Sequence, residues 1–188
     1  MTTTLRLISA GAALAGMLLI TAAPAAFAGP FLSSEGGKVS GPDAEFDEDE
    51  GKWLLEESGE PTYHIKDDGT IDFLTYRGFQ RYHSECHVCH GPEGVGSTYA
   101  PALTDSLKTM GYDDFVAVVS SGRIVSMPGG GESVMPALGD NKNVMCYLDG
   151  MYTYLKARSD GHLPRGRPRG RDPKPKALGE FENECVAG

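Results

Sequence analysis

The stretch SECHVCHGPEG, residues 84–94, places two cysteines three residues apart and a histidine directly after the second. On a helical turn the thiols of Cys86 and Cys89 lie on one face, and His90 follows immediately. This arrangement serves a redox-active disulfide, a metal site or the covalent attachment of a cofactor. The compartment narrows these alternatives, because a thiol pair has different uses in reducing and in oxidising surroundings.

The N-terminus has the pattern of an export signal. Arg6 supplies a positive charge, an apolar run covers residues 7–20, and Ala26 and Ala28 form a small-x-small cleavage site. We therefore predict a signal peptide at residues 1–28, cleaved after Ala28, and a periplasmic mature protein without a membrane span. A retained single-span anchor is the alternative, although the apolar run is short for a span.

The mature chain would have about 160 residues, enough for one compact domain with extensions. The whole chain has a formal net charge of −9, and this charge is unevenly distributed. Residues 35–60 contain ten acidic and two basic residues, whereas residues 156–176 contain eight basic and two acidic residues. An acidic chain without interleaved aromatic and basic residues argues against nucleic acid as the partner.

Composition also suggests how the chain is organised. We predict an acidic N-terminal extension at residues 29–60, a central domain at residues 61–160 and a basic Pro/Gly-rich arm at residues 161–188. Residues 33–51 contain few apolar side chains, so we expect them to be mobile or to lie on the surface. The arm either contacts a partner or only keeps the protein soluble.

The central domain reads as one small hairpin followed by three helices. The turn sequence Asp67-Asp68-Gly69 predicts a hairpin within residues 63–73. The helices are expected from about Tyr76 into the cysteine motif, at residues 112–121 before Gly122, and at residues 143–158. The last helix has one apolar face at 3.6-residue spacing, made of Val144, Leu148, Met151, Tyr152 and Leu155. We therefore expect this face to pack against a large apolar surface.

In an exported protein, Cys-x-x-Cys-His is the attachment sequence for c-type haem. Each thiol adds to a vinyl group of the porphyrin, and the imidazole of His90 binds the iron. A thioredoxin-like pair would need a βαβ surround that is missing, and a zinc site would need a second closely spaced ligand pair, which Cys146 and Cys185 do not form. A disulfide between Cys86 and Cys89 can form only in the chain without haem. We therefore predict one covalent haem c.

The chain also resembles class I cytochromes c beyond the motif. Gly78, Tyr82 and Cys86 follow one another at four-residue intervals, like the first helix of that family, and YTYLKA at residues 152–157 resembles the last one. The resemblance implies a mainly α fold packed around one haem, with Tyr82 beside the helix contact. GPEGVGSTYAPAL looks like the loop after the proximal histidine, so the carbonyl of Pro101 would accept a hydrogen bond from His90 Nδ1.

Two methionines compete for the sixth position of the iron. Met127 lies in SMPGGGE and Met135 lies in VMPALGD, and each precedes a proline. We favour Met135, because MPALG shortly before the last helix is similar to the family's methionine loop. His64, His83, His87 and His162 are the histidines left for a bis-histidine alternative. A thioether ligand would raise the reduction potential, and two filled axial positions would close the iron to substrates.

The remaining cysteines, Cys146 and Cys185, are separated by 39 residues. In an exported chain two such residues are more often joined than free. A disulfide between them would stabilise the fold by roughly 4 kcal/mol in the chain-entropy model. It would tie the end of the basic arm to the last helix.

These segments together resemble the methanol-metabolism-related four-cysteine c-type cytochromes, which are similar in role to cytochrome c-L. The match covers residues 61–168 and is most specific in YHSECHVCHGP and NVMCYLDGMYTYLKARSDG. It implies an electron-transfer protein rather than an enzyme. Its electron donor would be a PQQ-dependent methanol or alcohol dehydrogenase, including lanthanide-dependent ones, and its acceptor another cytochrome or an oxidase. The alternatives are a cytochrome subunit of another periplasmic dehydrogenase, and a haem enzyme or sensor with a displaceable sixth ligand.

Overall fold

The computed structural model describes residues 43–126 and 130–188 of the chain. The signal peptide predicted at residues 1–28, the first part of the acidic extension and Met127 lie outside the described residues. No helix within the described ranges combines the length and the apolar character that a membrane crossing requires.

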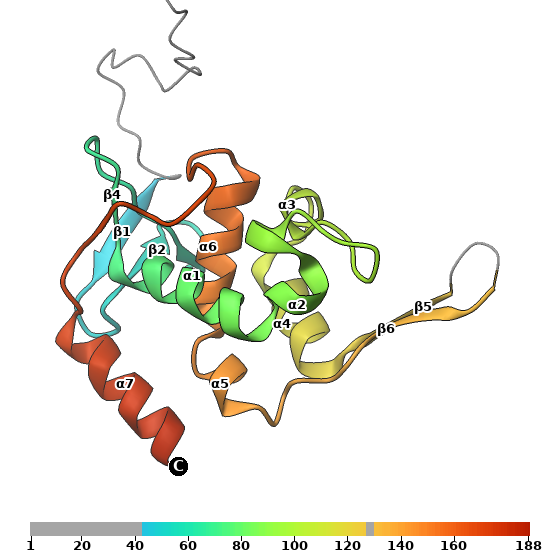
Figure 1. Ribbon diagram of the computed structural model, residues 1–188. Helices are drawn as coiled ribbons and strands as arrows, with labels where there is room; N and C mark the ends of the chain where they lie inside the picture. The colour runs from blue at the N-terminus through green and yellow to red at the C-terminus, as the bar shows by residue number, and fades with distance from the viewer. Residues whose placement is uncertain (1–42, 127–129) are drawn as a thin grey trace, which may run out of the picture. The chain divides into compact units, whose positions relative to one another are not determined.

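Helices make up most of the regular secondary structure within the described residues (Figure 1). They are α1 Phe73–Glu85, α2 His87–His90, the 3-10 helix η1 Pro92–Gly94, α3 Leu103–Ser106, α4 Tyr112–Ser121, α5 Lys142–Met145, α6 Leu148–Ser159 and α7 Lys176–Ala187. The strands are β1 Ala44–Asp47, β2 Lys52–Leu55, β3 Pro61–Thr62, β4 Thr70–Ile71, β5 Arg123–Ser126, β6 Glu132–Met135 and β7 Gly170–Arg171. They form an antiparallel β1-β2-β3 sheet, a parallel β4–β7 pair and an antiparallel β5–β6 hairpin. This hairpin projects from the helical body in Figure 1.

Helix α1 begins at a side-chain cap. Asp72 adopts an extended conformation and accepts a hydrogen bond from Thr75 N at 2.8 Å through Oδ1. Its other oxygen accepts one from His64 N at 2.9 Å. Because the first amides of a helix have no partners within the helix, this cap stabilises the start of α1. It also fixes α1 to the segment that precedes the hairpin turn.

The centre of the molecule is the crossing of α1 with α6. A Cβ atom on Gly78 would lie 1.7 Å from Gly150 O, so the two backbones touch at this point. One turn away, Thr75 Oγ1 donates to Thr153 Oγ1 at 3.1 Å in the buried interface. The apolar face predicted for the last helix is buried here, with exposed fractions of 5% or less. Around this crossing the buried hydrophobic side chains form one core cluster.

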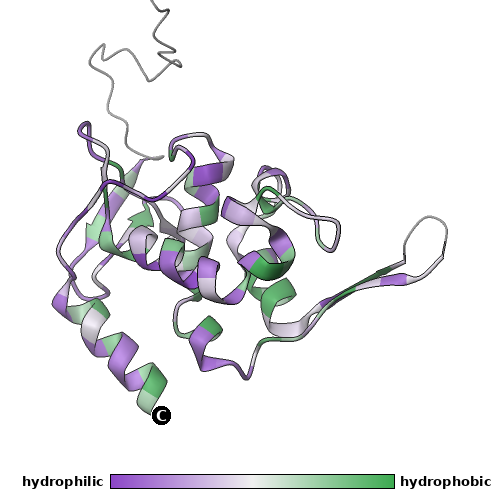
Figure 2. Ribbon diagram, viewed as in Figure 1, coloured by the Kyte–Doolittle hydropathy of each residue, from purple (hydrophilic) through white to green (hydrophobic). Residues whose placement is uncertain are grey.

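The three predicted helices differ from the observed ones in detail. Helix α1 starts at Phe73, three residues earlier than expected, because Asp72 caps it there. Helix α4 ends at Gly122 as predicted and is largely hydrophobic in Figure 2. The third stretch is divided into α5 and α6, since Tyr147 leaves the helical region with φ −129° and ψ 13°.

The hairpin turn at residues 67–69 forms a narrow loop. Lys66 N donates to Thr70 O at 2.9 Å, and Ile65 and Ile71 are bridge partners on either side.

The acidic extension departs from the expectation of a mobile or surface segment. Strand β1 lies within that segment and pairs with β2, and β2 pairs with β3 across the predicted boundary at residue 60.

The C-terminal arm, residues 161–188, is also more ordered than its composition suggested. Its strand β7 pairs with β4, and its last part is the 12-residue helix α7. Leu178 is buried in a small cluster with Phe73 and Leu74, and Cys185 forms a disulfide with Cys146. The predicted disulfide is therefore present, and it ties α7 to the break between α5 and α6.

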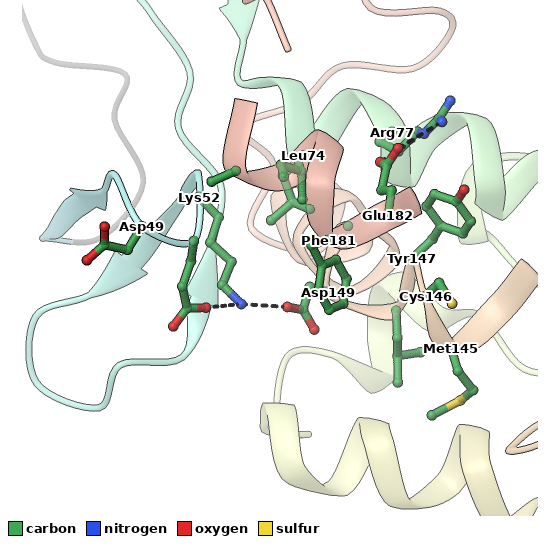
Figure 3. Close-up of a pocket in the computed structure, with 15 residues that line it drawn as sticks. Asp49, Lys52, Leu74, Arg77, Met145, Cys146, Tyr147, Asp149, Phe181 and Glu182 are labelled. Carbon is green, nitrogen blue, oxygen red and sulfur yellow. Dashed lines mark hydrogen bonds and ion pairs between the residues drawn. The ribbon is translucent and has the colours of Figure 1, made fainter. Parts of the chain in front are cut away.

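A cavity of about 270 Å³ remains where α7 meets α1 and α6 (Figure 3). Its charged groups are paired across it, with Lys52 Nζ 2.9 Å from Asp149 Oδ2 and Arg77 Nη2 3.1 Å from Glu182 Oε2. Glu182 is only 3% exposed and also accepts a hydrogen bond from Lys174 at 2.7 Å. These pairs hold α7 and the β1–β2 turn against the helical core.

The contact at the helix crossing predicts that one added methyl group at Gly78 lowers the stability of the protein strongly. Gly78→Ala should lower the free energy of unfolding by about 3 kcal/mol, because its Cβ would overlap a backbone carbonyl. Thermal unfolding of the purified protein measures this change. Gly179→Ala is the matched control, since its Cβ would meet only the flexible Lys174 side chain. There the helical preference of alanine should leave stability unchanged or raise it by up to about 1 kcal/mol. Equal stability of the two variants would show that the helices do not touch at Gly78.

The disulfide predicts a second stability change. Replacing Cys146 and Cys185 together by serine should lower the free energy of unfolding by roughly 4 kcal/mol. The reason is that the unfolded chain of the variant is no longer closed into a loop of 39 residues. Denaturant unfolding of the two proteins under non-reducing conditions measures the difference. A variant as stable as the parent would contradict a crosslink that constrains the unfolded chain.

Candidate haem-binding site

The cysteine motif occupies the short helical turn that follows α1. Cys86 N donates to Tyr82 O at 2.9 Å, so α1 continues into the motif, and His90 N donates to Cys86 O at 3.0 Å. Cys86 is half-buried and packs against the core, whereas Cys89 is exposed. Neither cysteine forms a disulfide. The two thiols are thus available to one ligand that reaches from the core to the surface.

The two thiols differ in their surroundings. Burial raises the pKa of the Cys86 thiol to about 12, and the charges of Glu85 and Cys89 act in the same direction. Its Sγ lies 3.8 Å from Met151 Sδ. Cys86 is thus the more shielded of the two thiols.

The imidazole of His90 is held in one orientation. The side chain is 7% exposed, and Nδ1 lies 3.1 Å from Pro101 O, to which it donates a hydrogen bond. This is the contact that the family resemblance implies. It leaves Nε2 as the ring nitrogen for a metal. An imidazole fixed in this way is suited to bind iron.

We call residues 91–101 the proximal loop. The hydroxyl of Tyr82, which is fully buried, donates to Gly91 O at 2.5 Å and accepts from Gly94 N at 2.9 Å. Gly96 N donates to His90 O at 2.8 Å. Tyr82 therefore fixes the start of the loop to α1, while the far end carries Pro101.

Met135 is the last residue of β6, and its side chain is partly buried against the core. We call residues 135–139 the methionine loop. Its end is bonded to the end of α4, with Leu138 N donating to Val119 O and Gly139 N to Ser120 O, both at 3.0 Å. Gly122 has φ +73°, and a Cβ there would lie 2.6 Å from Met135 O. The sequence predicted Gly122 only as a helix stop, because its contact with the methionine loop depends on the tertiary fold.

The β5–β6 hairpin reaches back to the proximal loop. Ser133 Oγ donates to Tyr99 O at 3.2 Å, and Ser133 lies on the same face of the hairpin as Met135. Large apolar side chains are exposed in the motif, the proximal loop and the hairpin: Val88, Val95, Tyr99, Ile124, Val125 and Val134. Figure 2 shows hydrophobic residues along this hairpin. Exposed apolar surface of this extent is a mark of a binding site.

The other candidate histidines are engaged elsewhere. His64 stacks on Trp53 with ring centroids 3.9 Å apart, and burial lowers its pKa. His162 packs edge-on against Tyr63, and His83 Nδ1 lies 2.8 Å from Phe79 O. His87 is beside His83 in the motif turn. Within residues 43–126 and 130–188, no group of three His, Cys, Asp or Glu side chains could hold a metal ion.

The residues present fit a haem. Two free thiols three residues apart could form the thioether bonds, the buried and oriented imidazole of His90 would supply a nitrogen to the iron, and Met135 would supply a thioether sulfur. The cofactor-binding residues predicted from the sequence are Cys86, Cys89, His90, Pro101, Tyr82 and Met135. Tyr82 near the end of α1, the three residues of the motif turn and Pro101 of the proximal loop lie together, and Met135 lies on the hairpin bonded to that loop.

Comparisons with known proteins point the same way. The chain is 49% identical over 138 residues to cytochrome c-553I of Paracoccus denitrificans, a match that covers 73% of this chain and 60% of that protein. It is 41% identical over 97 residues to cytochrome c-555 of Methylococcus capsulatus, covering 51% of this chain and 72% of that protein. The chain thus spans less than two thirds of the length of cytochrome c-553I.

A solved structure has the same fold. The c-type cytochrome XoxG from Methylobacterium extorquens AM1 matches with a TM-score of 0.67 and 45% identity. The match covers 78% of this chain and 93% of that one. No family model matches the chain. The predicted class I cytochrome c fold is confirmed by this likeness, and the relatives imply a covalently bound haem c.

The position of Met135 predicts a spectroscopic change. In the haem-loaded protein, Met135→Ala should abolish the methionine-to-iron charge-transfer band and convert the iron to high spin or to another ligand. Axial ligands tune haem potentials over about 0.8 V, so the potential should fall on the order of 0.1 V. Absorption spectroscopy and a redox titration measure both effects. Met127→Ala is the control and should leave the spectrum intact, whereas the reverse pattern would assign the ligand to Met127.

Proposed function

The chain belongs to the c-type cytochromes, and from this we propose that it is a periplasmic mono-haem carrier of electrons from a PQQ-dependent methanol or alcohol dehydrogenase. It is an electron-transfer protein and not an enzyme. The observation that carries the proposal is the buried His90 ring, oriented by Pro101 beside the free thiols of Cys86 and Cys89. This geometry serves to hold a haem permanently in one position.

Two features support a single haem. The sequence has one Cys-x-x-Cys-His motif among its four cysteines. The other two cysteines are joined to each other in the disulfide. No thiol therefore remains to attach a second haem through a thioether bond.

Each residue of the site has a separate task. Cys86 and Cys89 would anchor the group through thioether bonds and His90 would offer Nε2 to the iron, while Pro101 holds the His90 ring through its Nδ1 hydrogen bond. Met135 would supply sulfur from the methionine loop, which α4 and Gly122 position. The haem, when bound, would supply one-electron redox chemistry. Ligation by both His90 and Met135 would leave no position for a substrate, which suits electron transfer.

The partner is inferred from the resemblance to the methanol-metabolism-related four-cysteine c-type cytochromes. In that group the donor is the reduced quinone of an alcohol dehydrogenase, and a further cytochrome or an oxidase accepts the electron. The signal-like N-terminus supports a periplasmic location, where such dehydrogenases act. The chain has a formal net charge of −9, so electrostatic steering should contribute to the encounter with its partners.

Stopped-flow reduction tests this proposal. A PQQ-dependent methanol dehydrogenase with methanol should reduce the oxidised, haem-loaded protein rapidly. The second-order rate constant for reduction should fall about tenfold between low and physiological salt, because screening weakens the electrostatic steering. Haem absorbance at several salt concentrations gives the rates, and the mixture without methanol is the control. If dithionite reduces the haem and the dehydrogenase does not, the donor is a different enzyme, while the cytochrome assignment stands.

A further inference from the structure

Glu93 differs from its neighbours in the proximal loop. It lies three residues after His90, its side chain is buried at 9% exposure, and its φ is +60°. It is the one residue other than glycine with positive φ within residues 43–126 and 130–188. For a residue of this type the left-handed conformation costs roughly 1–2 kcal/mol. Such strain persists only where surrounding contacts fix the residue.

The contacts that fix Glu93 come from the far end of the chain. Arg165 Nε donates to Glu93 Oε2 at 2.7 Å, and the backbone amide of Gly166 donates to Oε1. Arg158 Nη2 of α6 lies 3.8 Å from the same carboxylate. Burial alone would raise the pKa of Glu93, but these hydrogen bonds and charges lower it overall. The carboxylate is therefore ionised and paired, as a buried charge requires.

Arg158 connects this carboxylate to the body of the protein. Its Nη1 donates to Leu163 O at 2.6 Å, so one guanidinium contacts both the start of the C-terminal arm and the proximal loop. Farther along the arm, Arg167 Nη2 donates to Tyr76 OH at 2.9 Å, and Lys66 pairs with Asp172. The arm is thus fixed on both sides of the contact with Glu93.

The proximal loop is held from two directions at this point. The hydroxyl of Tyr82 bonds the backbone on either side of Glu93, at Gly91 and Gly94, while the Glu93 side chain extends to the arm. The same loop ends at Pro101, whose carbonyl orients His90. The contacts of Glu93 and the bond that orients His90 thus belong to one loop.

We propose that Glu93 is a positioning residue, which clamps the proximal loop to the C-terminal arm and so maintains the His90–Pro101 hydrogen bond and the reduction potential of the haem. The arm is in this respect an internal part of the haem site. The proposal rests on haem attachment at Cys86 and Cys89 and on ligation by His90, and it does not depend on which dehydrogenase is the donor. Failure of the dehydrogenase experiment leaves it unaffected.

Glu93→Gln in the haem-loaded protein tests the clamp. The substitution keeps the shape of the side chain and removes its charge. A weaker bond at Nδ1 makes His90 a poorer donor to ferric iron, and the lost negative charge also favours the ferrous form. The equilibrium constant for reduction should therefore rise about threefold, which is about 28 mV for a one-electron couple. NMR should show at least tenfold faster exchange of the His90 Nδ1 proton with solvent.

Glu182→Gln is the matched control (Figure 3). Glu182 is likewise buried, pairs with the two cations Arg77 and Lys174 and holds the arm through α7, but it does not touch the proximal loop. Its variant should lose stability with no change in the potential or in the Nδ1 proton exchange. An equal shift of the reduction potential in Glu93→Gln and Glu182→Gln would show that any loosening of the C-terminal arm has this effect, and it would overturn the proposal.

Arg165→Gln covers the case in which Glu93→Gln fails to load haem. The Arg165 side chain is 69% exposed, so its replacement should leave folding intact. The deciding measurement is the exchange of the His90 Nδ1 proton, because the lost positive charge and the weakened clamp move the potential in opposite directions. Faster exchange supports the clamp. Unchanged exchange in this variant, or an unchanged potential in Glu93→Gln, would overturn it.

Discussion

The contact between the backbones of α1 and α6 at Gly78 and Gly150 is the constraint on which the rest of the structure depends. Any side chain at Gly78 would overlap a peptide group, so the distance between the helices is set by the absence of a Cβ. The haem motif directly follows α1, and Arg158 lies near the end of α6. The crossing therefore positions the end of α1, from which the motif turn with His90 continues, and Arg158, which lies beside the proximal loop. Hydrogen bonds such as the one between Thr75 and Thr153 act on helices already placed at this distance.

The proximal loop shows how a short irregular segment is made rigid without regular secondary structure. Its backbone is bonded to the hydroxyl of Tyr82, its far end to the ring of His90, and its one strained residue to the C-terminal arm. Each contact comes from a different part of the chain. A histidine held in this way would keep its orientation if a bound iron changed charge, so little reorganisation would oppose the transfer of an electron.

The chemistry of the site could be predicted from the sequence because it lies in consecutive residues. The spacing of Cys86, Cys89 and His90 predicts a haem once the export signal is taken into account, and the apolar face of the last helix follows from its 3.6-residue period. The contact of Pro101 with His90 followed from family resemblance, since residues eleven apart in a loop have no local pattern. The assignment of Met135 over Met127 remains a prediction from the same resemblance.

The parts that sequence reasoning missed depend on contacts between distant residues. Helix α7 buries only Leu178 and Glu182, so its apolar pattern is too sparse to mark a helix. Strands β4 and β7 are two residues long and pair over about 100 positions. A left-handed conformation at Glu93 has no local signal either, because glycine, asparagine and aspartate are the usual residues there. Its two arginines give the reason for it only when the fold is known.

The charges of the C-terminal arm acquire a different meaning from these contacts. In the sequence they form a basic block that either contacts a partner or keeps the protein soluble, but in the structure Arg165 faces Glu93, Arg167 faces Tyr76 and Lys174 faces Glu182. Arg171 lies over the rings of Phe73 and Tyr76. Arg165 and Lys174 contribute less to the outer field than isolated cations would, because the carboxylates of Glu93 and Glu182 beside them offset their charge at the distance of an approaching partner. The unevenness of charge along the sequence thus overstates the unevenness on the surface, and much of it serves to hold the arm against the haem site.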